Sequence, residues 1–554
     1  MTKLSRFIHF VSREIEISKG RVIAISGVAG LSNGLLLAVI NSAAEQASQA
    51  HIENRLFVLY AFAFLLMICS ERYSQTVTIA AVEKALQKIR LRITRKVCQA
   101  DLRFVEESAG VSAFSPLLQG VNNISEAVRE VIQVVRESLL LVVACLYILW
   151  LSPPTFVAVV IFLMVSIPIG IYYYQKTDDE MEIMEEREER FFERFEAILA
   201  GFKELKVNQK ERDALFAHVE KLSQDARDLR ISANNYLMNE DLLSHVTMYL
   251  LIAVAVLVMP QMMPEATGNV HKITAAILFL LGPAGLLVSA LPGLSKSAHI
   301  ISNLYKLENQ LDTVNRKNAA IENQTQKQYK RFERISLTQI EFTYQDKNNK
   351  ALFRAGPFNL EIHSGELLFI VGNNGTGKST FLKLLTGLYL PDHGSLFLDG
   401  HRITPQDYAS YRSLFSLVFT DFYLFDRLYG LVDIPDAEVN SWIEKMELQH
   451  KTAYKNGFFT NTDLSTGQRK RLAFISAILK KRPICIFDEL AADQDPTFRH
   501  RFYADILPEL QADGRTIIAV THDENYFRYC DRLIRLENGG ILSDSSFALE
   551  ASYD

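Results

Sequence analysis

The sequence predicts a protein of two unlike halves: an α-helical domain that crosses a membrane six times, followed by an α/β domain. In the first half, six apolar stretches are each long enough to cross a bilayer, which takes roughly 20 helical residues. In the second half, short apolar strands alternate with amphipathic helical stretches, the pattern of a parallel sheet covered by helices. We therefore divide the 554 residues into a transmembrane domain (1–307), a polar linker (308–330) and an α/β domain (331–554).

The charges around the apolar stretches predict their orientation. Basic side chains follow the second stretch, whereas 44–54 and 260–270 contain no lysine or arginine. Because cytoplasmic loops carry the excess of Lys and Arg, we expect both termini in the cytoplasm of a protein of the cytoplasmic (inner) membrane, with the lipid bilayer as a partner. The expected spans are about 22–43, 55–78, 131–152, 155–174, 242–260 and 273–293, and the basic residues are Lys84, Lys88, Arg90, Arg92, Arg95 and Lys96.

Two charged segments stand out in this half. Glu71-Arg72 interrupts the second span, and a charge at the bilayer centre costs about 2.5–3.5 kcal/mol. Either the pair faces a cavity or the helix is already leaving the hydrocarbon there. The run Asp178–Arg194 has the charge spacing of a solvated helix with i,i+4 ion pairs.

The composition argues against two other kinds of site. No block of basic residues alternates with aromatics, so no nucleic-acid surface is expected. The five cysteines are scattered and the histidines have no metal-ligand spacing, which disfavours a disulfide framework or a zinc cluster.

A glycine-rich turn in the second half predicts a phosphate site. The apolar strand Leu367–Val371 leads directly into GNNGTGKST, residues 372–380, and a helix follows. In such a P-loop the backbone N–H groups cradle the phosphates of ATP. Lys378 would contact the β and γ phosphates, and the Ser379 hydroxyl would ligate Mg²⁺. The expected nucleotide-binding residues here are Asn373, Asn374, Gly375, Thr376, Gly377, Lys378, Ser379 and Thr380.

A pair of carboxylates ends a second apolar strand. The strand Ile484–Phe487 is followed by Asp488 and Glu489. Adjacent carboxylates at the end of a strand suit two tasks: Asp488 would orient Mg²⁺, and Glu489 would accept a proton from attacking water. The alternative is a pair of solvated acids in a turn, which the position downstream of a P-loop disfavours.

Between these motifs stands LSTGQ, residues 464–468, a turn that by itself is only a helix N-cap. With the other motifs in this order, the chain resembles the ATP-binding cassette (ABC) family, whose signature loop is LSGGQ. By the same resemblance His522 is the switch histidine that senses the γ-phosphate, Tyr344 stacks on adenine, and Asp495 belongs to the loop after the second carboxylate.

The resemblance implies an assembly. Cassettes of this family pair head to tail, so Ser465, Thr466, Gly467 and Gln468 of one copy would complete the ATP site of the other. One cassette and six spans imply a half-transporter that works as a homodimer of the exporter type. By analogy of fold, the loops near 106–118 and 206–215 would dock on the cassettes.

Two positions depart from the family pattern. Thr466 replaces the first glycine of the signature, and a β-branched residue requires a regular turn there. Thr420 replaces the usual glutamine that touches Mg²⁺, so the contact would pass through water or through Asp421; the sequence leaves both open.

The closer resemblance is to exporters of cyclic peptides, of the syringomycin and pyoverdine type. It rests on LFSLVFTDFYLF, residues 414–425, and GFKELK, residues 201–206. It implies ATP-driven export of a peptide-like metabolite, such as a cyclic peptide or siderophore. The alternatives are a lipid or multidrug exporter and a non-transporting, ATP-gated membrane regulator.

Overall fold

The computed structural model separates into two compact units, described here one at a time. The helical unit comprises Met1–Cys98 and Gly110–Gln310, and the cassette unit comprises Gln99–Ala109 and Leu311–Asp554. The structure describes residues 10, 13–14, 19–48, 53–107, 111–258, 261, 270–290, 297, 300–313, 329–346, 350–431 and 433–546.

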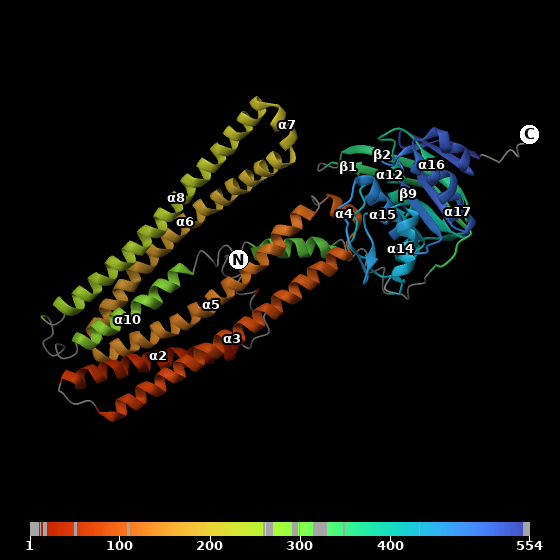
Figure 1. The fold of residues 1–554 in the computed structure, drawn as a ribbon. Helices are drawn as coiled ribbons and strands as arrows, with labels where there is room; N and C mark the ends of the chain where they lie inside the picture. Colours follow the sequence, from red (N-terminus) through yellow and green to blue (C-terminus); the bar gives the residue numbers. More distant parts are fainter. Residues whose placement is uncertain are drawn as a thin grey trace, which may run out of the picture. The chain divides into compact units, whose positions relative to one another are not determined.

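The helical unit consists of long helices, five of which are long and apolar enough to cross a membrane among the residues described. These stretches are Asn54–Cys98, Val128–Leu151, Pro153–Ala200, Gln209–Val258 and Val270–Leu287. The first expected span, 22–43, lies inside α2, which is not among these five stretches. Residues 259–260 and 291–293 of the last two expected spans lie outside the described residues. The helices are α2 (Lys19–Ser48), α3 (Asn54–Cys98), α5 (Val111–Leu151), α6 (Pro153–Ala200), α7 (Phe202–Val207), α8 (Gln209–Ala253), the π-helical η1 (Val254–Val258) and α10 (Val270–Ser289) (Figure 1).

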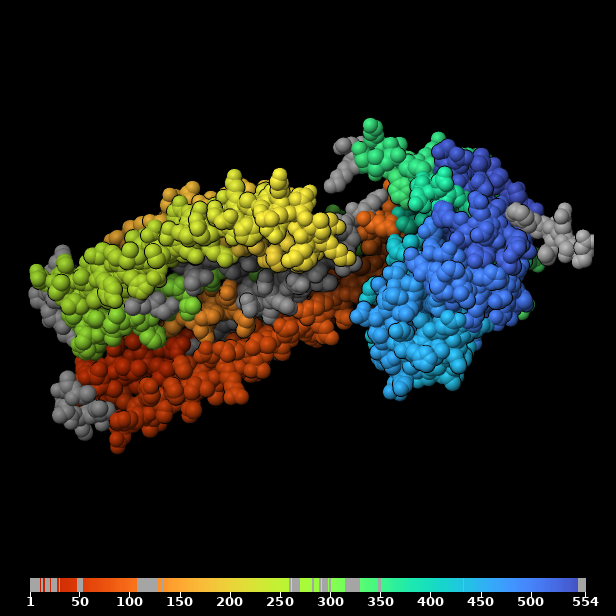
Figure 2. Space-filling view, turned by 45° about the horizontal axis from the view of Figure 1, so that its top comes forward, coloured from red at the N-terminus to blue at the C-terminus, as the bar shows by residue number. Residues whose placement is uncertain are grey.

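Helices α6 and α8 form a long antiparallel hairpin that α7 closes at one end (Figure 1). Its base packs on α5 and α10 through a buried cluster that includes Ile148, Val159 and Ile277. Large apolar side chains such as Met164 and Tyr249 stay exposed along the hairpin, whose outer surface Figure 2 shows in yellow and green. Such a surface suits a solvent of lipid tails or a second protein surface, because water would disfavour it.

The charges inside the second span have a partner on another helix. Arg136 of α5 donates to Glu71 of α3 at 2.6 Å and to the buried Glu137 at 2.7 Å. Glu71 is therefore held in an ion pair between helices, which compensates part of the cost of removing it from water. The sequence left open whether Glu71-Arg72 faces a cavity or lies where the helix leaves the hydrocarbon. Neither alternative included an ion pair with another helix.

A second ion network ties the end of α3 to segments far away in the chain. Arg92 contacts Glu14 at 3.0 Å and Glu308 at 2.8 Å, and Lys96 contacts Glu308 at 2.6 Å. Glu308 lies in the helical stretch 300–313, so the polar segment expected to be a linker begins within a helix. Residues 314–328 lie outside the described residues, and the domain boundaries expected from the sequence stay a prediction.

The cassette unit is built on a six-stranded sheet in the order β12-β11-β3-β10-β9-β6. All neighbouring pairs are parallel except β11 with β12, which confirms the expected parallel α/β sheet. The strands are β3 (Leu367–Val371), β6 (Phe415–Val418), β9 (Ile484–Asp488), β10 (Thr516–Val520), β11 (Arg532–Glu537) and β12 (Gly540–Ser546).

A four-stranded antiparallel sheet in the order β2-β1-β4-β5 completes the unit, together with a small β7–β8 pair. Its strands are β1 (Arg334–Gln345), β2 (Ala351–His363), β4 (His393–Leu398) and β5 (His401–Arg402); the pair is β7 (Tyr454–Lys455) and β8 (Phe458–Phe459). The helices are α4 (Leu102–Glu107), α12 (Lys378–Leu385), α13 (Tyr408–Arg412), α14 (Asp436–Lys445), α15 (Thr466–Ile478), α16 (Pro496–Arg501), η3 (Phe502–Ile506), α17 (Leu507–Ala512) and η4 (Glu524–Tyr529).

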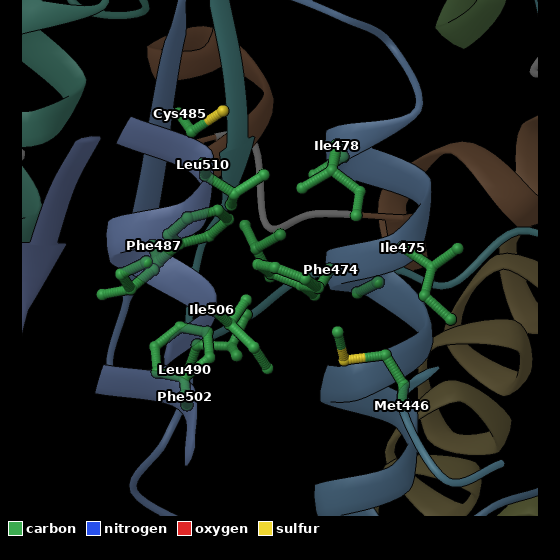
Figure 3. Close-up of a cluster of buried hydrophobic side chains, with 14 of the residues drawn as sticks. Met446, Phe474, Ile475, Ile478, Cys485, Phe487, Leu490, Phe502, Ile506 and Leu510 are labelled. Carbon is green, nitrogen blue, oxygen red and sulfur yellow. The ribbon is translucent and has the colours of Figure 1, made fainter. Parts of the chain in front are cut away.

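Aromatic packing fixes α15 against the central sheet. Phe474 of α15 lies 5.1 Å from Phe487 of β9 and 5.7 Å from Phe502, measured between ring centroids, and all three are fully buried (Figure 3). Buried aromatic pairs at these separations stabilise beyond the area they bury. The helix and the strand that carry the signature and the carboxylate pair are therefore held in one core.

We predict that Arg136→Met destabilises the protein by about 3–5 kcal/mol, because it leaves Glu137 buried and unpaired. Thermal unfolding in detergent measures the effect. The double variant Arg136→Met/Glu137→Gln should recover part of the loss. Arg190→Met, at an exposed pair with Glu186, should change stability by less than about 1 kcal/mol. An equal loss in all three variants would contradict a specific role for the buried pair.

Candidate nucleotide site

The P-loop is the turn between β3 and α12, and its glycines are there for steric reasons. Gly377 caps α12 with φ +95°, a left-handed conformation that L side chains rarely adopt. A Cβ on Gly372 would lie 2.4 Å from the carbonyl oxygen of Leu536. Both positions therefore require glycine, and the turn presents its backbone at the N-terminus of α12, where an anion is favoured.

Lys378 is buried and reaches back over the loop. Its Nζ donates to the carbonyl oxygens of Gly372 at 2.8 Å and Asn373 at 3.1 Å. Burial lowers the pKa of this lysine, while Glu489 and Asp488 oppose that shift. An ammonium held beside the phosphate cradle is suited to phosphate oxygens.

Asp488, at the end of β9, lies beside the P-loop. The Ser379 hydroxyl donates to its carboxylate at 3.1 Å, and the Thr420 hydroxyl donates to its main-chain oxygen at 3.4 Å. Burial raises the pKa of Asp488, the hydrogen bond from Ser379 opposes this, and the nearby Glu489 adds to the rise. A hydroxyl beside a buried carboxylate fits Mg²⁺, which prefers oxygen ligands and would supply the missing positive charge.

Glu489 sits in an unusual backbone conformation beside His522. Its φ is +50°, in the left-handed region, and its N–H donates to the carbonyl of Val520 at 3.2 Å. His522 Nε2 lies 3.1 Å from its carboxylate, and both side chains are partly exposed. The two predicted catalytic residues are therefore in direct contact at the open end of the sheet.

Tyr344 of β1 lies against the first turn of α12, the helix that follows the P-loop. Its hydroxyl lies 3.2 Å from that of Thr380, and its ring lies 5.0 Å from Phe342 and 6.1 Å from Tyr389. This aromatic group next to the P-loop is suited to stacking on a base.

The short helix α4 belongs to the cassette unit and contacts this aromatic group. Glu106 pairs with Lys383 of α12 at 2.8 Å and accepts a hydrogen bond from the Tyr389 hydroxyl, while Arg103 lies 5.2 Å from the Phe342 ring. Sequence reasoning expected a docking loop near 106–118 but missed Lys383 and Tyr389. They look like ordinary helix and turn residues, and no local signal identifies them.

The signature turn is a helix N-terminus, as the sequence suggested. Ser465 caps α15 in a capping box with Gln468, and Thr466 is the first helical residue, so its turn is regular. A Cβ on Gly467 would lie 2.7 Å from the carbonyl oxygen of Asp493.

The contacts divide the predicted site residues into two groups. Hydrogen bonds connect the P-loop with Asp488 and link Glu489 with His522. The signature turn is instead hydrogen-bonded to the loop after Glu489, where Gln494 donates to the carbonyl of Gly467 at 2.9 Å. In that loop Asp495 caps α16 through the N–H of Phe498 at 3.0 Å, and it pairs with Arg471 at 2.8 Å.

Comparison with known proteins agrees with this geometry. A family model described as "ABC transporter transmembrane region" matches residues 22–281, and one described as "ABC transporter" matches residues 356–492. The chain is 29% identical over 487 residues to "ATP-binding protein SyrD" of Pseudomonas syringae pv. syringae, covering 84% of each protein.

Other similarities are narrower or concern the fold. An "ATP-dependent lipid A-core flippase" of Neisseria meningitidis serogroup A is 33% identical over 229 residues, 38% of this chain and 35% of that protein. A bacterial Atm1-family ABC exporter solved with ATP bound has a TM-score of 0.71 at 17% identity, covering 95% of this chain and 94% of that one. This last match shows the fold, which is that of an exporter.

We predict that Asp488→Asn stabilises the nucleotide-free protein at pH 7. The raised pKa means that the folded state holds a proton more tightly than the unfolded state, so the ionised carboxylate weakens folding above the folded pKa. The gain should shrink as pH falls through the folded pKa and vanish below the ordinary pKa of an aspartate. A pH series of thermal unfolding measures it. A gain that grows towards acid would contradict the assignment.

Proposed function

The chain belongs to the ABC transporter family, and on that premise we propose that it exports a peptide-like metabolite as a homodimer driven by Mg²⁺-ATP. The family implies a multi-pass membrane protein that binds ATP and couples its hydrolysis to transport. The proposal adds the inner membrane, both termini in the cytoplasm, the pairing of two copies and the class of substrate.

The observation that carries the ATPase part is the contact of Glu489 with His522 beside the Asp488–Ser379 pair. In the proposal Glu489 accepts the proton of the attacking water, and His522 orients that carboxylate and senses the γ-phosphate. Lys378 and the P-loop amides hold the phosphates, and Ser379 and Asp488 hold Mg²⁺. When bound, Mg²⁺ supplies the charge that neutralises the phosphate oxygens.

Thr420 has a defined place in this proposal. Its hydroxyl is engaged with the main-chain oxygen of Asp488, and the neighbouring Asp421 is exposed. We therefore assign Thr420 to support of the Asp488 backbone, and its effect on Mg²⁺ passes through that residue.

The pairing of two copies rests on the signature turn. Ser465 caps α15, and the carbonyl of Gly467 accepts a hydrogen bond from Gln494 in the loop after Glu489. The family model of the cassette matches the chain once. A second copy supplies the signature residues to each nucleotide in this proposal. In this proposal ATP binding closes the two cassettes and turns the transport cavity outward. ATP hydrolysis then returns the cavity to its starting orientation.

The substrate class rests on similarity over length. The likeness to SyrD extends over 84% of the chain, including the membrane half, whereas the likeness to the lipid A-core flippase covers 38%. Similarity over this share of the chain supports a similar class of transported substrate. The second candidate, a lipid, is favoured only by the shorter match.

We predict that Glu489→Gln lowers ATP turnover about 10²–10⁴-fold while nucleotide binding stays intact, because it removes a general base. ATPase assays and titration with a fluorescent nucleotide measure the two quantities. Glu444→Gln, on the exposed side of α14, is the matched control and should behave as wild type. Normal turnover in Glu489→Gln would refute the assignment.

The same pair of variants tests export. Mass spectrometry of medium and cells should find a peptide-like compound lost from the medium of Glu489→Gln cells and accumulated inside them. A lipid that accumulates in the inner leaflet instead would favour the flippase alternative. Equal metabolite and lipid profiles in an ATPase-active protein would favour a regulator.

We also predict that Glu106→Gln leaves basal ATPase within about threefold of wild type but lowers export by about tenfold. The carboxylate joins α4 to Lys383 and Tyr389, and weakening a charge-assisted contact costs about 1.5–3 kcal/mol. Export into vesicles per ATP hydrolysed measures the coupling. An unchanged ratio would show that α4 is only packed on the cassette.

A further inference from the structure

A buried lysine on the signature helix contacts the main chain of the catalytic glutamate. Lys470 of α15 is 5% exposed, and its Nζ donates to the carbonyl oxygen of Glu489 at 2.9 Å. The same ammonium pairs with Asp493 at 2.6 Å. In the sequence it looks like the middle of a solvated Arg-Lys-Arg run, and no motif of the nucleotide site includes it.

A buried ammonium at this position does not by itself stabilise the fold. Taking a charge out of water is unfavourable unless hydrogen bonds and an opposite charge compensate it, and apolar residues of similar volume are often as stable. Leu472, Ala473 and Phe474, which follow Lys470 on α15, are buried in the apolar core. A methionine would fit that environment, so what the ammonium adds is the contact with Glu489 and Asp493.

Glu489 needs such a contact because its backbone is strained. A non-glycine residue at φ +50° persists only when the surrounding structure holds it there. Its N–H is held by Val520, and its carbonyl accepts hydrogen bonds from Lys470 and from the N–H of Ala492 at 3.3 Å. Of these contacts, the one from Lys470 is made by a side chain, so it can be removed without changing the backbone.

Lys470 also holds the loop that follows. Asp493 pairs with its ammonium, and one turn earlier on α15 the carbonyl of Gly467 accepts a hydrogen bond from Gln494 at 2.9 Å. The closeness of the Asp493 carbonyl to Gly467 leaves no room for a side chain there. The first turns of α15 therefore hold the whole stretch from Glu489 to Gln494.

We propose that Lys470 is a positioning residue that holds the main chain of Glu489 so that the carboxylate faces His522 and the P-loop. The inference rests on the proposed ATPase function. Without the ammonium, Glu489 can relax towards an ordinary backbone conformation, and its carboxylate leaves the position from which it accepts a proton. A misplacement of about 1 Å at such a group costs about 10²-fold in rate.

The test compares Lys470→Met with Lys470→Gln in the full-length protein. Methionine keeps the volume but donates no hydrogen bond, whereas a glutamine amide still donates to the carbonyl of Glu489. We expect Lys470→Met to lower kcat by about 10- to 100-fold with KM for ATP within about threefold, and Lys470→Gln to restore most of kcat. Lys481→Met, at an exposed pair with Glu438, is the control and should keep wild-type kinetics.

A second measurement needs no nucleotide. Hydrogen–deuterium exchange should show faster uptake in the segment 489–495 of Lys470→Met, with the β3 segment unchanged and the thermal midpoint within a few degrees of wild type. Lys470→Gln should return the uptake of 489–495 towards the wild-type rate.

Three outcomes would overturn the inference. One is a wild-type kcat in Lys470→Met. Another is unchanged exchange at 489–495. The third is an equal loss of kcat in both variants with faster exchange throughout the cassette, which would mean a packing role. If wild type does not exceed the Glu489→Gln background, the proposed function fails, and the exchange experiment still reports on the Lys470 contact.

Discussion

The nucleotide site depends on the parallel pairing of β3, β10 and β9. Val520, the last residue of β10, pairs with Ile370 on one side and with Asp488 on the other. Because the carboxyl ends of parallel strands meet at one edge of a sheet, the P-loop, Glu489 and His522 all begin within two residues of this row. All three strands are completely buried, as expected of central strands in a parallel sheet that is covered on both faces.

At this edge the fold places charged groups that burial disfavours. Lys378 and Asp488 are both buried beside the P-loop, and burial lowers the pKa of the lysine and raises that of the aspartate. Both shifts disfavour the charged forms that phosphate and metal binding need. In the function proposed here, a bound nucleotide and cation would compensate charges that the fold has already removed from water, so the site would gain more from them than a solvated site would.

Sequence reasoning succeeded where the signal was local. An apolar run followed at once by GNNGTGKST, or by Asp488-Glu489, predicts a strand end and its chemistry, and the strands β3 and β9 agree with it. It failed for contacts between distant positions. Glu71 contacts Arg136, 65 residues away in the chain, and Lys383 contacts Glu106, 277 residues away. None of these four residues belongs to a sequence motif that would have indicated its partner. The antiparallel sheet was missed because β1 pairs with β2 through several irregularities, which break the alternation of apolar residues.

Helix α15 connects these parts. Its N-terminus carries Ser465, its second turn carries Lys470 on the main chain of Glu489, and its third turn carries Phe474 against Phe487. A displacement of the signature end would therefore act on the backbone of Glu489 through Lys470 and on the following loop through Asp493 and Gln494, while the aromatic contact holds the third turn in the core. Because surrounding contacts hold Glu489 at its left-handed φ, a movement that loosens those contacts would favour an ordinary backbone conformation there.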